Sequence, residues 1–285
     1  MTRFRPAHEH LSMRIIERGG GPPLALVPGI QGRWEYARPA IDELARSFRV
    51  ITFSLCDEPA SGCRWATSLD AFASHIEAVL DEVRIEKAII CGVSFGGLIA
   101  LRFSTLRPNR VQALILAATP GPDWQLNRRQ RMYARAPRLF GPAFLAETPG
   151  RVRAELRRAF PSASERWRFL WRQLRTLTAA PLSFSRMAER ARLVDGASIA
   201  RDCSLLVAPT LIISGDPSLD HIVPSDGSAG YTSLIRHATL VRLADTGHLG
   251  YITKPGVFAA AVSRFADEVV RQSPQAGVGT RNDAA

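Results

Sequence analysis

The sequence predicts an α/β protein whose mostly parallel central sheet is covered by helices on both faces. Short apolar runs rich in β-branched residues alternate with stretches of helical periodicity, which is typical of parallel strands joined by helices. The chain of 285 residues is 46% hydrophobic and 22% charged, a length and balance that suit one large domain. The alternation stops once, between residues 122 and 208, and we interpret that stretch as an inserted helical lid.

Seven runs have the composition of strands. They span Met13–Arg18, Leu24–Pro28, Val50–Leu55, Ala88–Val93, Ala113–Ala117, Thr210–Ser214 and Thr239–Leu243. The helices predicted between and after them span Pro39–Ser47, Leu69–Val83, Phe95–Leu106 and Val257–Arg271. The second helix follows Ser68, a favourable N-cap, and places Phe72, Ile76 and Val79 on one face.

The lid divides the predicted core into two segments. Residues 1–121 and 209–272 form the core, 122–208 the lid, and 273–285 a polar tail that we expect to be disordered. Prolines are expected to break the lid into short helices at positions 122, 137, 142, 149, 161 and 181.

One lid segment has an amphipathic helical pattern. Its apolar members are Trp167, Leu170, Trp171, Leu174 and Leu177, and Arg168, Arg172 and Arg175 share another face. A second apolar stripe consists of Val152, Leu156 and Phe160. The aromatic residues would either line a substrate cavity or pack the lid on the core, and packing is the commoner role. For the less common role in a cavity, the candidate pocket residues are Trp167 and Trp171, together with Trp34 near the N-terminus.

The formal net charge of +11 is almost entirely arginine, because Lys87 and Lys254 are the only lysines. Arginines scattered along the chain predict a solvated basic surface. The lid has no helix-turn-helix, zinc or RNA-recognition pattern, so we expect no specific nucleic-acid partner.

The chain contains no run of about 18 apolar residues, and its first ten residues lack the apolar core of a signal peptide. We therefore expect no membrane span and a cytoplasmic location. The cysteines at 56, 63, 91 and 203 form no Cys-x-x-Cys pair, and the spacing of potential ligands predicts no metal site.

Residues 92–96 read Gly-Val-Ser-Phe-Gly and follow the apolar run at 88–90. This pattern predicts a sharp turn from a buried strand into a helix, with the hydroxyl of Ser94 raised above the sheet edge. Glycine at both ends leaves room for the turn, where a side chain would clash with a neighbouring strand or helix.

A serine nucleophile needs a base, and the base needs an acid that orients it. After a turn of this type the expected order along the chain is serine, acid, histidine. His248 follows the last predicted strand and is the favoured base, with His221 as the rival. Asp220 in an Asp-x-x-Val-Pro sequence is the favoured acid, and Asp216, directly after a glycine, is the alternative.

A tetrahedral intermediate also needs hydrogen-bond donors for its oxyanion. The predicted strand ending at Pro28 continues as Gly-Ile-Gln-Gly at 29–32. We expect the backbone N–H groups of Ile30 and Phe95 to be these donors, because Phe95 begins a helix whose free N–H groups favour negative charge.

These features resemble the α/β-hydrolase fold superfamily from about Leu11 to Val270. The strongest parts are residues 92–96, 220–224 and 247–248. The resemblance implies a triad of Ser94, Asp220 and His248, with a lid inserted after the sixth strand. In length and lid position the chain is similar to the esterase, lactonase and C–C hydrolase branches.

The chain departs from the family at two loops. The family often has His-Gly where this chain has Pro28-Gly29, so a hydrogen bond that orders the oxyanion loop is either missing or supplied elsewhere, with Gln31 as one candidate. Residues 56–62 replace the frequent Arg-Gly-x-Gly-x-Ser stretch. Serine at 94 argues against epoxide hydrolases and dehalogenases, which use an aspartate nucleophile.

The sequence therefore predicts a serine hydrolase that acts on a small carboxylic ester or related acyl substrate without a cofactor. A C–C hydrolase, lactonase or amidase could use the same triad. A non-catalytic ligand receptor on the same scaffold is a further alternative, because fold alone does not determine function.

Overall fold

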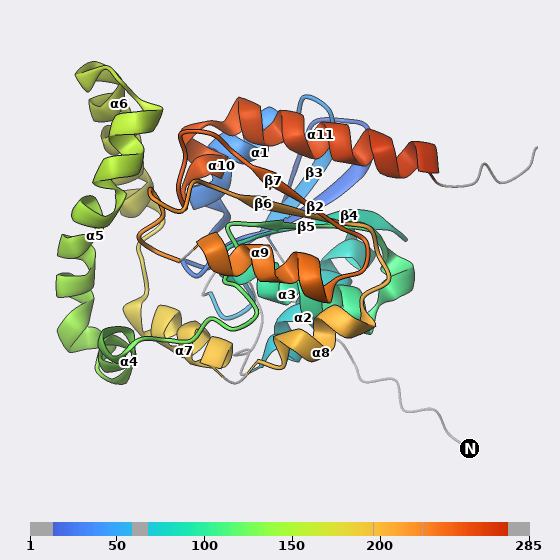
Figure 1. Ribbon diagram of the computed structural model, residues 1–285, viewed down its shortest axis with the longest axis horizontal. Helices are drawn as coiled ribbons and strands as arrows, with labels where there is room; N and C mark the ends of the chain where they lie inside the picture. Colours follow the sequence, from blue (N-terminus) through green and yellow to red (C-terminus); the bar gives the residue numbers. More distant parts are fainter. Residues whose placement is uncertain (1–13, 59–67, 196, 224, 273–285) are drawn as a thin grey trace, which may run out of the picture.

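The computed structural model describes residues 14–58, 68–195, 197–223 and 225–272 (Figure 1). Its seven-stranded sheet has the order β1-β3-β2-β4-β5-β6-β7. The strands are β1 (Ile15–Arg18), β2 (Pro23–Val27), β3 (Arg49–Phe53), β4 (Ala88–Val93), β5 (Val111–Ala117), β6 (Thr210–Ser214) and β7 (Ala238–Arg242). Only the edge strand β1 pairs in antiparallel fashion, with β3. The predicted mostly parallel sheet is confirmed.

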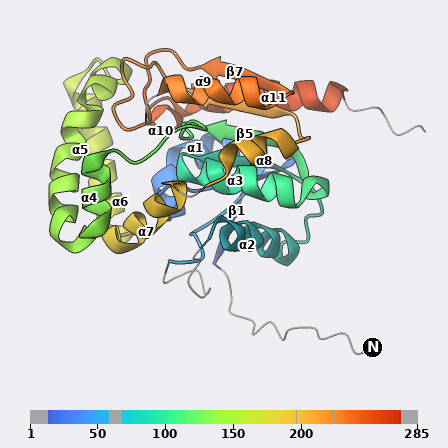
Figure 2. The ribbon, with the colours of Figure 1, turned by 60° about the horizontal axis from the view of Figure 1, so that its bottom comes forward.

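Helices cover both faces of this sheet (Figures 1 and 2). One face carries α1 (Arg38–Leu44), α10 (Gly250–Thr253) and α11 (Pro255–Gln272), and the other carries α2 (Leu69–Glu82), α3 (Phe95–Leu106), α8 (Ile199–Leu205) and α9 (Ser225–Leu234). Leu24 and Leu26 of β2 face the first layer, while Ala25 and Val27 face the second. Successive strand residues point to opposite faces, so a sheet covered on both sides needs continuous apolar runs.

Most predicted elements lie within two residues of their observed bounds, and β4, β6 and α3 match them. Ser68 caps α2 as expected, since its Oγ accepts a hydrogen bond from the Ala71 N–H at 3.2 Å. Helix α1 ends three residues earlier than predicted, because Arg46 and Ser47 donate to carbonyls three residues back and tighten the final turn.

The stretch predicted as a lid contains five helices between β5 and β6. They are α4 (Arg128–Arg135), α5 (Pro137–Ala159), α6 (Ala163–Ala179), α7 (Phe184–Asp195) and α8. In both ribbon views α4 to α7 stand beside the sheet, whereas α8 packs with α3 in the core (Figures 1 and 2). Helices α4 to α7 are called the insertion below. They follow the fifth strand of this chain, not the sixth.

The prediction that every proline breaks a helix is wrong at two positions. Pro142 and Pro149 lie inside α5, which continues through both. A proline removes one backbone donor and disfavours the helix, but flanking residues can keep the helical path. Pro137 begins α5, and Pro161 and Pro181 lie in the connections on either side of α6, where proline is tolerated.

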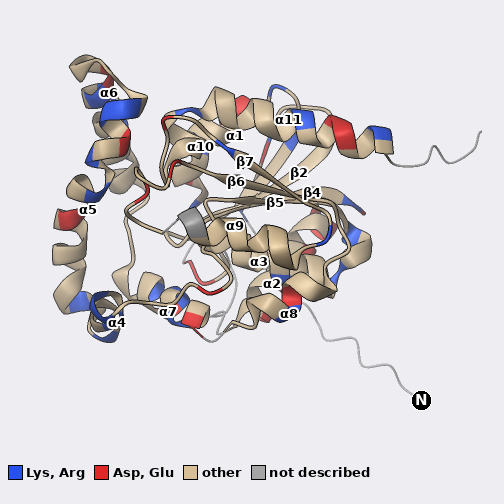
Figure 3. Cartoon of the chain, viewed as in Figure 1, with Lys and Arg blue, Asp and Glu red and all other residues tan. Residues whose placement is uncertain are grey.

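Basic residues occur on the core helices as well as on the insertion, with acidic residues among them (Figure 3). Arg102 of α3, for example, pairs with Asp70 at 2.6 Å and with Asp202 at 2.7 Å. In the described part of the chain, no helix combines the length and the apolar character that crossing a bilayer requires.

Candidate active site

Ser94 lies at the turn between β4 and α3 and has the backbone angles φ 52° and ψ −122°. Such a positive φ is uncommon for a non-glycine residue and marks a strained turn. A Cβ atom at Gly92 would lie 2.3 Å from the Gly96 carbonyl oxygen, and one at Gly96 would lie 2.4 Å from that of Val27. Both glycines are therefore required by close backbone contacts, as the sequence pattern predicts.

The structure brings Ser94, His248 and Asp220 together at the carboxyl ends of the strands. His248 Nε2 lies 3.2 Å from Ser94 Oγ, and His248 Nδ1 lies 3.4 Å from Asp220 Oδ2. Both His248 and Asp220 are buried. The histidine thus contacts a hydroxyl on one side and a carboxylate on the other, the geometry that a general base needs.

Asp220 is held by backbone donors as well as by the histidine. Its Oδ1 accepts hydrogen bonds from the N–H groups of Ile222 and Val223, both at 2.9 Å. Burial alone would raise the pKa of Asp220, but these bonds and His248 together bring that pKa below its usual value. Asp216 instead accepts from the backbone and hydroxyl of Ser218 and lies in an exposed turn.

The loop after β2 forms a turn beside the serine. The Gly32 N–H donates to the Gly29 carbonyl at 2.9 Å, and a Cβ at Gly29 would lie 3.5 Å from Ser94 Cβ. Ile30 at the turn and Phe95 at the start of α3 both line the cavity that contains Ser94.

That cavity has a volume of about 150 Å³ and lies between the sheet edge and the insertion. Its polar side chains come from Ser94, Gln130, Tyr133 and Arg151. Its apolar lining comes largely from α4, α5 and α7, including Ala134, Phe140, Phe144, Phe184, Met187, Ala188, Ala191 and Val194. The cavity is therefore apolar at most of its surface, with the hydroxyl of Ser94 exposed to it.

The three candidate pocket tryptophans lie elsewhere. Trp34 packs in the core layer of α1 and α11. Trp167 and Trp171 are 72% and 61% exposed, since α6 buries Phe169 and turns its apolar stripe outward. None of the three is among the residues that line the Ser94 cavity, so the structure does not bring them to this pocket.

Glu155 of α5 contacts the loop that carries His248, a contact that the sequence did not predict. Its side chain is only 1% exposed, and Oε2 accepts the Leu249 N–H at 3.0 Å while Oε1 lies 3.3 Å from the Thr253 hydroxyl. Burial raises its pKa, although bonds from the backbone of Gly247 and Leu249 oppose the rise. The sequence signal is a glutamate on the same helix face as Val152 and Leu156.

The raised pKa of Glu155 predicts a pH-dependent effect of its replacement by glutamine. A carboxyl group whose pKa is higher in the folded state stabilises the fold most below its unfolded pKa of about 4.3, and this stabilisation declines as the pH rises through the folded value. The Tm of Glu155→Gln relative to the unmodified protein should therefore increase from acidic to neutral pH. Calorimetry across that range measures the difference.

A pH-independent difference for Glu155→Gln would contradict a raised pKa at that position.

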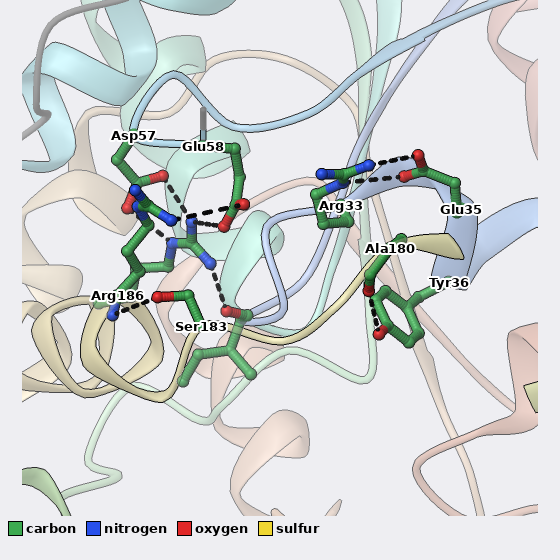
Figure 4. Close-up of polar contacts among 10 residues, drawn as sticks. Arg33, Glu35, Tyr36, Asp57, Glu58, Ala180, Ser183 and Arg186 are labelled. Atoms are coloured by element: carbon green, nitrogen blue, oxygen red, sulfur yellow. Dashed lines mark hydrogen bonds and ion pairs between the residues drawn. The ribbon is translucent and has the colours of Figure 1, made fainter. Parts of the chain in front are cut away.

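Arg190 of α7 also makes buried contacts that could not be predicted from the sequence. Its side chain is 1% exposed and pairs with Asp57 and Glu58, each 3% exposed, in the loop after β3. Figure 4 shows both carboxylates facing the helix that also carries Arg186. The departure from the family pattern noted at residues 56–62 thus includes two acids that pair with the insertion. Residues 59–67 lie outside the described part of the chain.

Comparison with known proteins agrees with this architecture. A family model for the alpha/beta hydrolase fold matches residues 22–255. The chain is 30% identical over 273 residues to 2-hydroxymuconate semialdehyde hydrolase of Pseudomonas sp. strain CF600. The aligned region covers 89% of this chain and 90% of that protein. It is 28% identical over 287 residues to polyketide synthase ThaQ of Burkholderia thailandensis, covering 92% of this chain but 12% of ThaQ.

Among solved structures, the enol-lactonase from Burkholderia xenovorans LB400 superposes with a TM-score of 0.71 at 19% identity, covering 89% of this chain and 95% of that one. This likeness concerns the fold. The family match over most of the chain, with the strand order and the strained serine turn, shows that the protein belongs to the alpha/beta hydrolase fold family.

Proposed function

We propose that this protein is a serine hydrolase that cleaves a small carboxylic ester or related acyl compound through an acyl-enzyme. The observation that carries the proposal is the chain of contacts from Ser94 Oγ through His248 to Asp220, at 3.2 Å and 3.4 Å, beside an apolar cavity. These contacts support the proposal, because covalent catalysis by a serine requires a hydroxyl beside a base that an acid orients.

In the first half-reaction Ser94 Oγ attacks the carbonyl carbon and its proton passes to His248 Nε2. Asp220 keeps the imidazole oriented and stabilises its cationic form. The N–H groups of Ile30 and Phe95 donate to the oxyanion of the tetrahedral intermediate. The bond to the leaving alcohol then breaks as His248 transfers the proton to the alkoxide oxygen, which leaves Ser94 acylated.

In the second half-reaction water attacks the acyl carbon and gives one proton to His248. The bond to Ser94 Oγ breaks, the serine recovers its proton from His248, and the carboxylic acid is released. Every group that these steps use is a side chain of the triad, a backbone N–H or water.

The cavity favours a small acyl group. Its volume of about 150 Å³ equals that of an engineered apolar cavity that holds benzene, and its lining from α4, α5 and α7 offers mostly apolar surface. We therefore expect short acyl chains to be preferred over long ones.

A second candidate is cleavage of a C–C bond by the same residues. The similarity to 2-hydroxymuconate semialdehyde hydrolase, at 30% identity over nearly the full length of both chains, favours it. Incubation with 2-hydroxymuconate semialdehyde, followed by absorbance, separates it from ester hydrolysis. A higher kcat/KM for that compound than for nitrophenyl esters would establish the C–C reaction instead.

A covalent probe tests the shared mechanism. A fluorophosphonate should form a stable adduct at Ser94, identified by peptide mass spectrometry, and should abolish hydrolysis of p-nitrophenyl butyrate in parallel. Hydrolysis should be faster for butyrate than for octanoate, because the cavity is small. A folded protein that forms no adduct at Ser94 would indicate a ligand receptor on this scaffold.

A further inference from the structure

The oxyanion loop is fixed from three directions. Its turn is closed by the Gly32 N–H and Gly29 carbonyl at 2.9 Å. The Leu55 N–H, in the loop after the neighbouring strand β3, donates to the Gly32 carbonyl at 2.7 Å. The third contact comes from the insertion, where Arg190 Nη1 donates to the Ile30 carbonyl at 2.7 Å. The Gly29 carbonyl lies in the same peptide group as the Ile30 N–H, whereas the Ile30 carbonyl lies in the next peptide group, the one that Arg190 contacts.

The guanidinium of Arg190 is held in one orientation. Nε donates to Asp57 Oδ2 at 2.9 Å and Nη2 to Asp57 Oδ1 at 2.6 Å, which is a bidentate pair. Nη2 also donates to Glu58 Oε1 at 2.6 Å. The planar fork therefore leaves Nη1 directed at the Ile30 carbonyl, a geometry that the flexible point charge of lysine does not reproduce.

Gly32 leaves the space that the guanidinium of Arg190 occupies. A Cβ at Gly32 would lie 2.3 Å from both Nη atoms of Arg190, and Gly32 has φ +76°. Arginine at 190 and glycine at 32 thus fit each other closely. Figure 4 places Arg33, the next residue, in a separate pair with Glu35, away from the two carboxylates of the β3 loop.

We propose that Arg190 is a positioning residue for oxyanion stabilisation: it fixes the Ile30 carbonyl and thereby aims the Ile30 N–H at the reacting carbonyl oxygen. The inference rests on the proposed function. The Gly32 contact holds the peptide group that contains the Ile30 N–H, and the Arg190 contact holds the peptide group that follows it. Because each peptide group is planar, the two contacts together restrict the φ and ψ torsions of Ile30 and so the direction of its N–H. In this chain, where Pro28-Gly29 stands in place of the family's frequent His-Gly, Arg190 thus supplies a hydrogen bond that orders the oxyanion loop.

The same helix also contacts the substrate cavity. Met187, Ala188 and Ala191 of α7 line it, while Arg190 reaches the oxyanion loop and the β3 loop. A helix that covers the acyl group therefore also orders a transition-state donor. Such donors are effective because they are oriented before the reaction begins.

The first test replaces Arg190 with lysine. The positive charge stays beside Asp57 and Glu58, but an ammonium group cannot keep the fork and the Ile30 contact together. We expect kcat for p-nitrophenyl butyrate to fall about 10- to 100-fold, somewhat less than loss of a whole oxyanion donor, while KM stays within about threefold. Arg33→Lys is the matched control and should keep kcat, since Arg33 contacts Glu35 and not the Ile30 carbonyl.

A second variant tests the proposal if Arg190→Lys does not fold. Removing only Arg190 would take the guanidinium that Asp57 and Glu58 share away from two buried carboxylates, so Arg190→Met is combined with Asp57→Asn and Glu58→Gln. In this variant none of the three side chains carries a charge, and the side chain at 190 has no donor for the Ile30 carbonyl. It should show the same selective fall in kcat, with its fold checked by circular dichroism and Tm.

Binding measurements separate positioning from a general structural effect. A boronic acid that forms a tetrahedral adduct with Ser94 should bind the Arg190 variants more weakly, by the factor lost in kcat, while a neutral substrate-like inhibitor should bind unchanged. A folded variant with unchanged kcat, or equal weakening of both ligands, would overturn the proposal. If the unmodified protein itself neither hydrolyses esters nor forms the fluorophosphonate adduct, the proposed function fails instead.

Discussion

Ser94→Ala is expected to lower kcat/KM for p-nitrophenyl butyrate by roughly 10⁴- to 10⁶-fold. The variant lacks the nucleophile that His248 contacts at 3.2 Å, so only binding and oxyanion donation can contribute to the remaining rate. The turn itself should persist, because Ser94 makes its backbone contact through N–H donation to the Ala117 carbonyl at 2.7 Å. Steady-state kinetics and thermal unfolding measure both effects.

Ser104→Ala is the matched control on the same helix. Ser104 is buried and its hydroxyl donates to the Ala100 carbonyl at 2.8 Å, a local bond far from the chemistry. Its removal should leave kcat/KM within about twofold of the unmodified protein. Equal activity of Ser94→Ala and the unmodified protein would remove Ser94 from the mechanism, whatever the fold.

The part of the site at 92–96 could be predicted because its constraints are local. A buried strand, two glycines and an apolar helix define the turn at Ser94 without knowledge of distant contacts. His248 and Asp220 were also placed from local signals, since parallel strands deliver the loops that follow them to one sheet edge. The structure places Asp220 beside His248 and Asp216 in an exposed turn, a difference that the sequence does not show because both residues follow the same strand.

The insertion was less predictable because its contacts are distant along the chain. The stripe of Trp167 and Trp171 has the spacing of a packed helix face, yet α6 buries Phe169 instead. Nothing local distinguishes Arg190 from the exposed charged residues around it, and the only local signal for Glu155 is the helix face that it shares with Val152 and Leu156. Their partners lie at Leu249 and in the loop after β3, so their roles depend on how the insertion sits on the core.

The assignment of the acid predicts opposite outcomes for two aspartates on one loop. Asp220→Asn should lower kcat by about 10³- to 10⁴-fold, because the amide no longer stabilises the cationic imidazole and can favour the wrong tautomer of His248. Asp216→Asn should leave kcat within about twofold, since that side chain serves an exposed turn at Ser218. Kinetics of the two variants at neutral pH make the comparison.

Stability across the acid range provides an independent check on Asp220. A carboxylate whose folded pKa is lowered contributes stability above its unfolded pKa of about 3.9, and this contribution is lost as the pH falls through the folded value. The stability difference between the unmodified protein and Asp220→Asn should therefore shrink on acidification. If Asp216→Asn lost more activity than Asp220→Asn, the contacts of Asp220 with His248, Ile222 and Val223 would serve only to hold the loop, and the acid of the mechanism would be Asp216.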